Sequence, residues 1–347
     1  MLADCTILID GDAAAPPLET PAGEAATAAA TPLTRPSPAP GLLERSQNLA
    51  AALNAVDVVT PDRSEFLREL RLTLASLGPD DGHPGAALLL TGLAQTGTST
   101  IAQKTLGCLS MPKPMSPWTV THPAMTLSLD TQTSLQTLIW LMLTDLNPVF
   151  GLMTAASKID PQRDGRRLRQ LLKERQVEWL VVDHAEALVV DDPKKLAPIR
   201  GFLGRLRSDG INLILCGLEP VAQLVAATSE TAADVVHCRT QVYDKANEAD
   251  IDELARFVGA FLDCAALPAA VLAEDWFRQC LIEVTQGRRG LAKHLVKKAI
   301  MIAFNSGATS VTVKHFVRAL KSGLNPELAK KLARAARAAK PSRSNVK

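Results

Sequence analysis

A strand that enters a glycine-bounded loop and leaves through a helix constrains this chain more than any other stretch. Residues 86–109 read AALLLTGLAQTGTSTIAQKTLGCL. Gly92, Gly97 and Ser99 occupy their places in the phosphate-loop pattern G-x-x-x-x-G-K-[ST], whereas Thr98 stands where that pattern has lysine. Backbone N–H groups at such a turn and at the helix N-terminus form a concave site for an anion such as a triphosphate. The stretch therefore predicts a phosphate-binding loop, with a glycine turn that binds nothing as the competing interpretation.

The loop supplies most of the residues that we predict to bind ATP. Ser99 would also be a ligand of Mg²⁺, unless its hydroxyl only caps the helix. The lysine missing at Thr98 removes a charge-assisted hydrogen bond of roughly 1.5–3 kcal/mol, which weakens affinity by about 10- to 100-fold. Lys104 lies about 7.5 Å further along the helix, too far to replace that lysine. The predicted ATP-binding residues are Gly92, Gln95, Thr96, Gly97, Thr98, Ser99, Thr100 and, from a later segment, Arg288.

A second candidate cluster follows the apolar run 177–183, VEWLVVD. Asp183 ends this run, where the Mg²⁺-positioning acid of a P-loop ATPase is expected. The carboxylate that orients water normally comes next, but His184 stands there and Glu186 follows two residues later. We predict that Asp183 is a water-mediated Mg²⁺ ligand and that Glu186 positions the attacking water. The alternative for Asp183 is an acid at the end of a strand that caps the next loop. The alternative for Glu186 is a solvated acid in that loop.

Two arginines outside these clusters are further candidates. Arg239, in HCRT, is predicted to reach the nucleotide of a neighbouring subunit as an arginine finger, or else to pair at the surface with Asp234 or Glu230. Arg288 is predicted to approach the phosphates from a C-terminal helical region. Its alternative is a surface pair with Arg289 at the start of a helix.

Apolar runs alternate with amphipathic segments through the middle of the chain, which is typical of a parallel sheet covered on both faces. The expected strands are 86–90, 124–129, 177–183 and 211–216, and a last strand is expected within 235–243. Beyond residue 244 the strand signal ends and four amphipathic segments predict a small all-helical domain. These segments are 247–262, 273–285, 289–305 and 312–321.

These patterns divide the chain into four parts. Residues 1–42 are rich in Ala, Pro and Thr and predict a disordered tail, because they cannot bury enough apolar surface to offset their ordering entropy. Residues 43–244 form the α/β part with N-terminal helices, and residues 245–322 form the helical domain. Residues 323–347 form a basic tail, which carries seven Lys or Arg and one acid from Pro326 onward. This tail is expected to contact DNA phosphates without sequence preference, unless it is merely solvated.

Composition narrows the location of the protein. Six cysteines without a C-x-x-C pair predict free thiols in a reducing cytoplasm. No run approaches the ~18–20 apolar residues of a membrane span, so no membrane partner is expected. The acids in MLADCTILIDGD stand where a signal peptide carries positive charge, which argues against secretion.

Taken in order along residues 43–321, these motifs resemble the TniB/TnsC family of AAA+ ATPases that regulate DNA transposition. The motifs that carry the resemblance are the glycine loop, VVDHAEAL at 181–188, INLILCGLEPVAQLV at 211–225, HCRT at 237–240 and the T-x-G of Thr285-Gln286-Gly287. The chain departs from the family pattern at Thr98 and His184, and both departures fall on parts used for hydrolysis.

The resemblance implies a P-loop NTPase sheet of the AAA+ type with a C-terminal helical lid. It also implies ATP and Mg²⁺ as cofactors, with impaired or lost hydrolysis. The implied assembly is a homo-oligomeric ring or filament on DNA, which recruits or activates a transposase and target-selection proteins. The alternative is a nucleotide-free pseudo-ATPase that serves as a scaffold or adaptor for protein partners.

Overall fold

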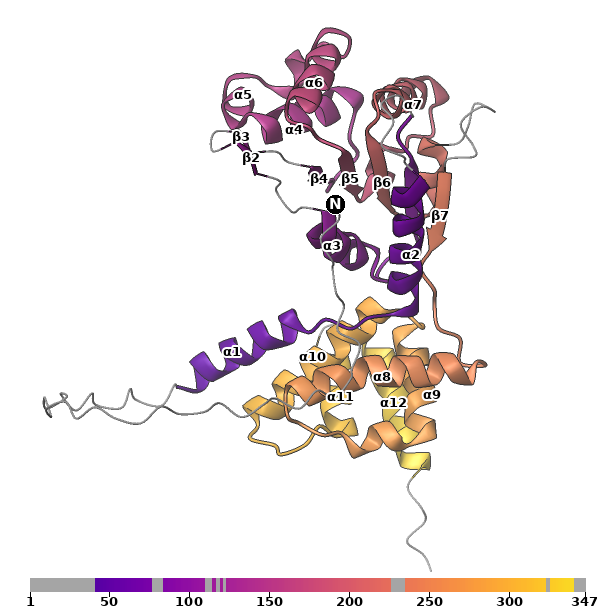
Figure 1. Ribbon diagram of the computed structural model, residues 1–347. Coiled ribbons are helices and arrows are strands. Elements are labelled where there is room, and N and C mark those ends of the chain that lie inside the picture. The colour runs from indigo at the N-terminus through magenta and orange to yellow at the C-terminus, as the bar shows by residue number, and fades with distance from the viewer. Residues whose placement is uncertain are drawn as a thin grey trace, which may run out of the picture.

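The computed structural model describes residues 41–76, 84–109, 114–116, 119–120, 123–225, 235–322 and 325–339. An α/β part and a helical part make up this structure, and the chain crosses between them after the last sheet strand (Figure 1). Nearly all of the predicted disordered tail, 1–42, lies outside the described residues. None of the described helices is long and apolar enough to cross a membrane.

Five parallel strands form the sheet. Its order is β4 (Ala124–Ser128), β5 (Trp179–Asp183), β6 (Asn212–Gly217), β1 (Ala87–Thr91) and β7 (Val235–Arg239). Every residue of the three central strands β5, β6 and β1 is buried, as a sheet covered on both faces requires. The parallel sheet predicted from the sequence is therefore confirmed.

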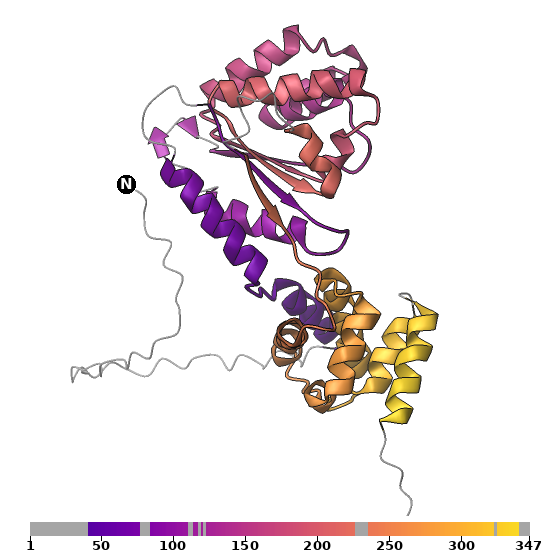
Figure 2. The same ribbon diagram turned by 90° about the vertical axis from the view of Figure 1, so that its right-hand side faces the viewer.

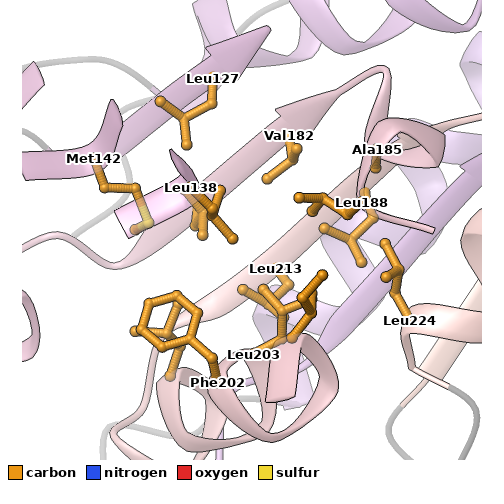
Figure 3. Packing of buried hydrophobic residues seen from close by; sticks show 14 of the residues in the cluster. Leu127, Leu138, Met142, Val182, Ala185, Leu188, Phe202, Leu203, Leu213 and Leu224 are labelled. Atoms are coloured by element: carbon orange, nitrogen blue, oxygen red, sulfur yellow. The ribbon is translucent and has the colours of Figure 1, made fainter. Parts of the chain in front are cut away.

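Alternate residues of each strand face opposite layers of helices. On one face Leu89, Val182 and Leu213 pack against α4 (Leu135–Leu146), α6 (Arg163–Glu174) and α7 (Pro193–Ser208) (Figure 3). On the other face Leu88 and Val181 pack against α2 (Pro61–Ser76) and α3 (Thr98–Leu109), and Figure 2 shows these helices on that side. The shorter elements are β2 (Pro114–Ser116), β3 (Thr119–Val120), α5 (Pro148–Met153), η1 (Ala156–Lys158), η2 (Ala185–Leu188) and η3 (Glu219–Leu224).

The last strand occupies the first part of the stretch 235–243 in which the sequence places it, and it ends at Arg239. The Gln241 N–H donates to Asp62 Oδ2 at 2.7 Å, and the Tyr243 N–H donates to the Gly287 carbonyl at 3.0 Å. Residues 241–243 satisfy their backbone outside the sheet, because here the chain crosses to the helical part.

The helical part has its own core. Its elements are α8 (Glu248–Cys264), η5 (Ala270–Ala273), α9 (Asp275–Thr285), α10 (Arg289–Asn305), α11 (Val313–Lys321) and α12 (Pro326–Ala338). Helix α1 (Leu42–Ala55), which the sequence grouped with the α/β part, contacts α10 and buries Leu53 in this core.

Helix α12 lies in the segment that was expected to be a basic tail. Asn325 caps its N-terminus by accepting from the Glu327 N–H at 2.9 Å, and Pro326 takes the first helical position. Ala329 and Leu332, three residues apart, are buried in the helical core. The basic segment is thus folded up to Ala338, and residues 340–347 lie outside the described residues.

A buried ion pair joins the two parts. Arg289, the first residue of α10, contacts Asp62 in the first turn of α2, and their side chains are 4% and 6% exposed. The Arg289 guanidinium lies 5.6 Å from the centre of the Tyr243 ring. Since Asp62 also accepts the Gln241 N–H, this one carboxylate connects α2, the crossing segment and α10.

We expect Asp62→Ala to lower the free energy of unfolding by about 3–5 kcal/mol, because the substitution leaves the Arg289 cation buried without its counter-ion. Chemical denaturation followed by circular dichroism measures the loss. Asp191→Ala removes an exposed acid and serves as the control, with an expected change within about 0.5 kcal/mol. Equal losses in the two variants would show that the buried pair does not hold the parts together.

Candidate functional site

The loop between β1 and α3 is a tight turn with two residues in the left-handed region. Gln95 and Gly97 adopt positive φ angles of 66° and 105°, which reverse the chain twice before α3 begins. The Gly92 N–H donates to the Gly217 carbonyl at 3.1 Å, so the loop starts beside the end of β6. Gly92 has no room for a side chain, because a Cβ there would overlap the Thr240 hydroxyl.

The hydroxyl groups of Thr96 and Thr240 stabilise this loop through hydrogen bonds. Thr96 Oγ1 donates to the Leu93 carbonyl at 2.8 Å and lies 2.6 Å from Thr240 Oγ1. Thr240 in turn donates to the Thr91 carbonyl through its N–H at 2.7 Å and its hydroxyl at 3.2 Å. The Thr96 N–H also donates to the Leu93 carbonyl, at 3.2 Å. Thr96, predicted to bind ATP, is therefore fully buried with its polar groups engaged inside the loop.

Four consecutive amides at the start of α3 have no acceptor among the described residues. They belong to Gly97, Thr98, Ser99 and Thr100, and the first helix-forming bond comes from the Ile101 N–H to the Gly97 carbonyl at 3.0 Å. Unpaired N–H groups at a helix N-terminus carry partial positive charge. The four N–H groups are thus available to an acceptor from outside the described residues.

Residues at the N-terminus of α10 donate hydrogen bonds to the backbone carbonyl oxygens of the loop. The Gly290 N–H donates to the Gln95 carbonyl at 2.7 Å, and Arg289 Nε donates to the Thr96 carbonyl at 3.2 Å. Arg288 Nη1 lies 3.4 Å from the Ala94 carbonyl. Arg288, predicted to approach the phosphates, instead directs its guanidinium to the loop backbone and lines neither of the two cavities beside the loop.

Ser99 and Asp183 meet at the carboxyl edge of the sheet. Ser99 Oγ donates to Asp183 Oδ1 at 2.9 Å, and the His184 N–H donates to the same oxygen at 3.0 Å. A hydroxyl and a carboxylate are hard oxygen ligands, which suits Mg²⁺ held by one or two side chains together with substrate phosphates. Among the described residues no three His, Cys, Asp or Glu side chains converge as a metal site.

Glu186 lies at the end of β6. Its Oε2 accepts the Leu218 N–H at 3.1 Å, and its Oε1 lies 3.4 Å from His184 Nδ1. Gly217 leaves room for this carboxylate, because a Cβ there would overlap Glu186 Oε2. His184 itself adopts a left-handed backbone with φ of 56°, and half of its side chain is exposed. Burial raises the pKa of the nearby Cys216 thiol, and Asp183 and Glu186 add to this, so Cys216 stays neutral.

Two cavities adjoin the loop. The first, of about 560 Å³, is lined by residues 97–100 together with His184, Glu186 and, from α10, Leu291 and His294. The second, of about 70 Å³, lies on the other side of Gly97 and has apolar walls. Those walls are Val56, Val58, Ile101, Phe257 and Phe261, with Lys293 also at its lining.

Sequence reasoning missed the second cavity and the α10 residues His294 and Lys293. The apolar walls come from the segment before α2, from α3 and from α8, which are distant in the sequence. No local spacing marks residues that converge only through tertiary packing. The sequence offered one signal, the run Gly287-Arg288-Arg289-Gly290. In the structure Gly290 approaches Gln95 so closely that a Cβ at position 290 would lie 2.5 Å from the Gln95 carbonyl oxygen.

Arg239 stands apart from these groups. It ends the edge strand β7 with 69% of its side chain exposed, and its Nε lies 3.5 Å from Glu219 Oε1. The partners suggested as alternatives, Asp234 and Glu230, lie outside the described residues. Within one chain Arg239 lines neither cavity beside the loop.

Neither family models nor curated proteins match this chain. Solved structures do match it in fold. Cdc6p from Pyrobaculum aerophilum superposes with a TM-score of 0.57 and 17% identity, covering 78% of this chain and 70% of that one. The ORC1 protein of Aeropyrum pernix in complex with DNA gives a TM-score of 0.56 and 16% identity, covering 79% and 69%. The ORC2 protein of Aeropyrum pernix, in ADPNP–ADP complexes, gives 0.55 and 12%, covering 78% and 70%.

These likenesses extend over both the sheet and the helical part. At such low identity they concern the arrangement of the elements and not the chemistry of single residues. Together with the five-stranded parallel sheet, the glycine loop at its carboxyl edge and the helical region that follows, they define one architecture. The chain has the fold of an AAA+ P-loop NTPase with a C-terminal helical lid.

Proposed function

We propose that this protein is an ATP-binding AAA+ regulator that assembles on DNA and controls transposition, with impaired hydrolysis. The observation that carries the proposal is that the residues of the four unpaired amides, Ser99 among them, line one cavity, while the Ser99 hydroxyl donates to Asp183. An anion site beside two hard oxygen ligands is what a nucleotide triphosphate with Mg²⁺ requires. The fold neighbour from Aeropyrum pernix described in ADPNP–ADP complexes supports the same ligand class.

The parts of the nucleotide are assigned to the two cavities. Phosphates bind at the amides of residues 97–100 in the cavity of about 560 Å³, where Ser99 and Asp183 hold Mg²⁺. The base enters the apolar cavity between Val58 and Phe257, so the segment before α2 and the helical part both contact it. When bound, Mg²⁺ supplies charge neutralisation between the phosphates.

Hydrolysis is the weakest part of the machinery. Thr98 brings no cation to the phosphates, and His184 takes the place of the carboxylate that normally follows Asp183. Glu186 lines the cavity, and its carboxylate is held by the Leu218 N–H. We propose that Glu186 positions the attacking water poorly and that hydrolysis is therefore slow, so that the protein acts mainly in its nucleotide-bound state.

DNA binding and oligomerisation are supported by the fold and by surface charge. One neighbour of the same fold is described in complex with DNA. Helix α6 exposes Arg163, Arg166 and Arg167 among its cations, and Arg239 is exposed at the sheet edge, where a neighbouring subunit can meet it. The order of motifs shared with TniB/TnsC proteins supports transposition, with a transposase and target-selection proteins as partners.

Thr98→Lys tests the nucleotide site. Restoring the cation at the phosphates should tighten ATP binding about 10- to 100-fold, since a charge-assisted hydrogen bond contributes roughly 1.5–3 kcal/mol. Titration of a fluorescent ATP analogue with Mg²⁺ into the full chain measures the change. Thr98→Met, of similar length but uncharged, is the matched control and should leave affinity near that of the unmodified chain.

The outcome separates the two candidate roles. Saturable binding that only the lysine variant strengthens supports the nucleotide-binding regulator. If neither the unmodified chain nor Thr98→Lys binds at millimolar nucleotide, the protein is a scaffold with an empty site. Turnover is expected to stay low even in Thr98→Lys, because His184 is unchanged.

Salt dependence tests the DNA contacts of the basic tail. The affinity for a labelled duplex should fall about 10³- to 10⁵-fold between 50 and 200 mM salt if some 6–10 phosphates are contacted. Lys340→Ala with Arg343→Ala should make the slope of log affinity against log salt less steep by about 2, since each phosphate contact contributes about 0.9. Point substitutions are chosen because truncation at residue 330 would remove the buried Leu332.

The matched control for this experiment is Lys194→Ala with Lys195→Ala, two exposed cations on α7. The control should leave the slope unchanged. If both double variants change the slope equally, the tail is not a specific DNA contact and only the net charge of the chain matters.

A further inference from the structure

A groove on the outer surface of the helical part has no role in the site described above. It lies between η5, the start of α9, α11 and α12, and its volume is about 1,010 Å³. Its floor is apolar and consists of half-buried side chains, chiefly Val271, Trp276, Val313 and Val317. We call this surface the α11–α12 groove; α11 and α12 form the yellow part of the helical region in Figure 2. An exposed apolar floor with a polar rim is typical of an interaction site.

The rim of the α11–α12 groove is strongly cationic. Lys314, Arg318, Lys321 and Arg337 line it, against the single acid Glu274. None of these four cations forms an ion pair with a residue in the part of the chain that the structure describes, although neighbouring Lys330 and Lys331 pair with Glu327 and Glu283. Burial lowers the pKa of His315, and the nearby positive charges of Arg318 and Lys314 lower it further. The groove is thus built for an occupant that is both apolar and acidic.

One segment of this chain has that chemistry. Residues 2–12 read LADCTILIDGD, with the apolar cluster Ile7, Leu8 and Ile9 and with three acids, Asp4, Asp10 and Asp12. The segment contains no lysine or arginine. The next roughly 30 residues, 13–41, are rich in Ala and Pro and carry no comparable apolar cluster. The apolar centre and flanking carboxylates of 2–12 therefore match the floor and rim of the groove.

We propose that residues 2–12 bind the α11–α12 groove of their own chain, with Ile7–Ile9 on the apolar floor and the aspartates at the cationic rim. The connection is long enough, because roughly 30 residues span up to about 100 Å when extended and about 30 Å as a flexible coil. Its anchor, α1, already packs on α10 of the same helical part. A tether of this length gives the segment a millimolar effective concentration at the groove, so weak contacts suffice. The proposal does not depend on nucleotide binding.

The native Cys5 within the segment provides the test. In the full chain, Ala336→Cys places a second thiol in the groove on α12 and keeps all four cations. Ala197→Cys, on exposed α7, is the matched control for the same kind of substitution on a helix that the tether can also reach. Under a mild oxidant we expect Cys5 to form a disulfide within one chain at least about tenfold faster in the Ala336→Cys variant than in the Ala197→Cys variant. Peptide mapping by mass spectrometry identifies each bond.

Two further variants, both made in the Ala336→Cys background, test the chemistry of the contact. Ile7→Asp with Ile9→Asp should reduce the rate of disulfide formation between Cys5 and position 336 to that of the control, and it leaves the described structure untouched. Arg318→Glu with Arg337→Glu should do the same, whereas Lys194→Glu with Lys195→Glu, an equal change of charge on α7, should not.

Three results would overturn the proposal. Equal rates at positions 336 and 197 mean that the segment does not select the groove. A disulfide that forms between chains, with a rate that rises with protein concentration, assigns the segment to a second copy. Protection of the introduced thiol at position 336 by added duplex DNA, with no bond to Cys5, assigns the cationic groove to nucleic acid.

Discussion

The phosphate loop of this protein is held from outside by the first residues of α10. Three successive loop carbonyls, those of Ala94, Gln95 and Thr96, accept from Arg288, Gly290 and Arg289. In a trans peptide the C=O and N–H groups point in opposite directions, so carbonyls directed at α10 leave the following amides facing away from it. The helical part therefore helps to set which way the loop dipoles point, before any ligand is present.

Arg289 makes this arrangement continuous with the rest of the molecule. The same guanidinium contacts the Thr96 carbonyl, the Asp62 carboxylate and the face of the Tyr243 ring. The loop, α2 and the segment that crosses between the two parts therefore share contacts with one buried cation.

Local patterns in the sequence predict those features that local geometry determines. Residues 92–99 must form a turn into a helix, and Asp183 must lie near Ser99 because parallel strands end at the same edge of a sheet. Helix α12 was not predicted, because its many cations suggested a basic tail. Its two buried residues, Ala329 and Leu332, can be recognised only from the packing of α12 against α11 and α9. The apolar cavity beside Val58 and Phe257 was missed for a similar reason, because its walls come from separate segments.

The space above Gly217 has a consequence for how this sequence can change over time. Glu186 fills the volume that any side chain at position 217 would need, and Leu218 binds the carboxylate there. Any larger residue at 217 would therefore have to move this carboxylate away from the Leu218 N–H, so the two positions constrain each other's side chains despite their separation in the chain.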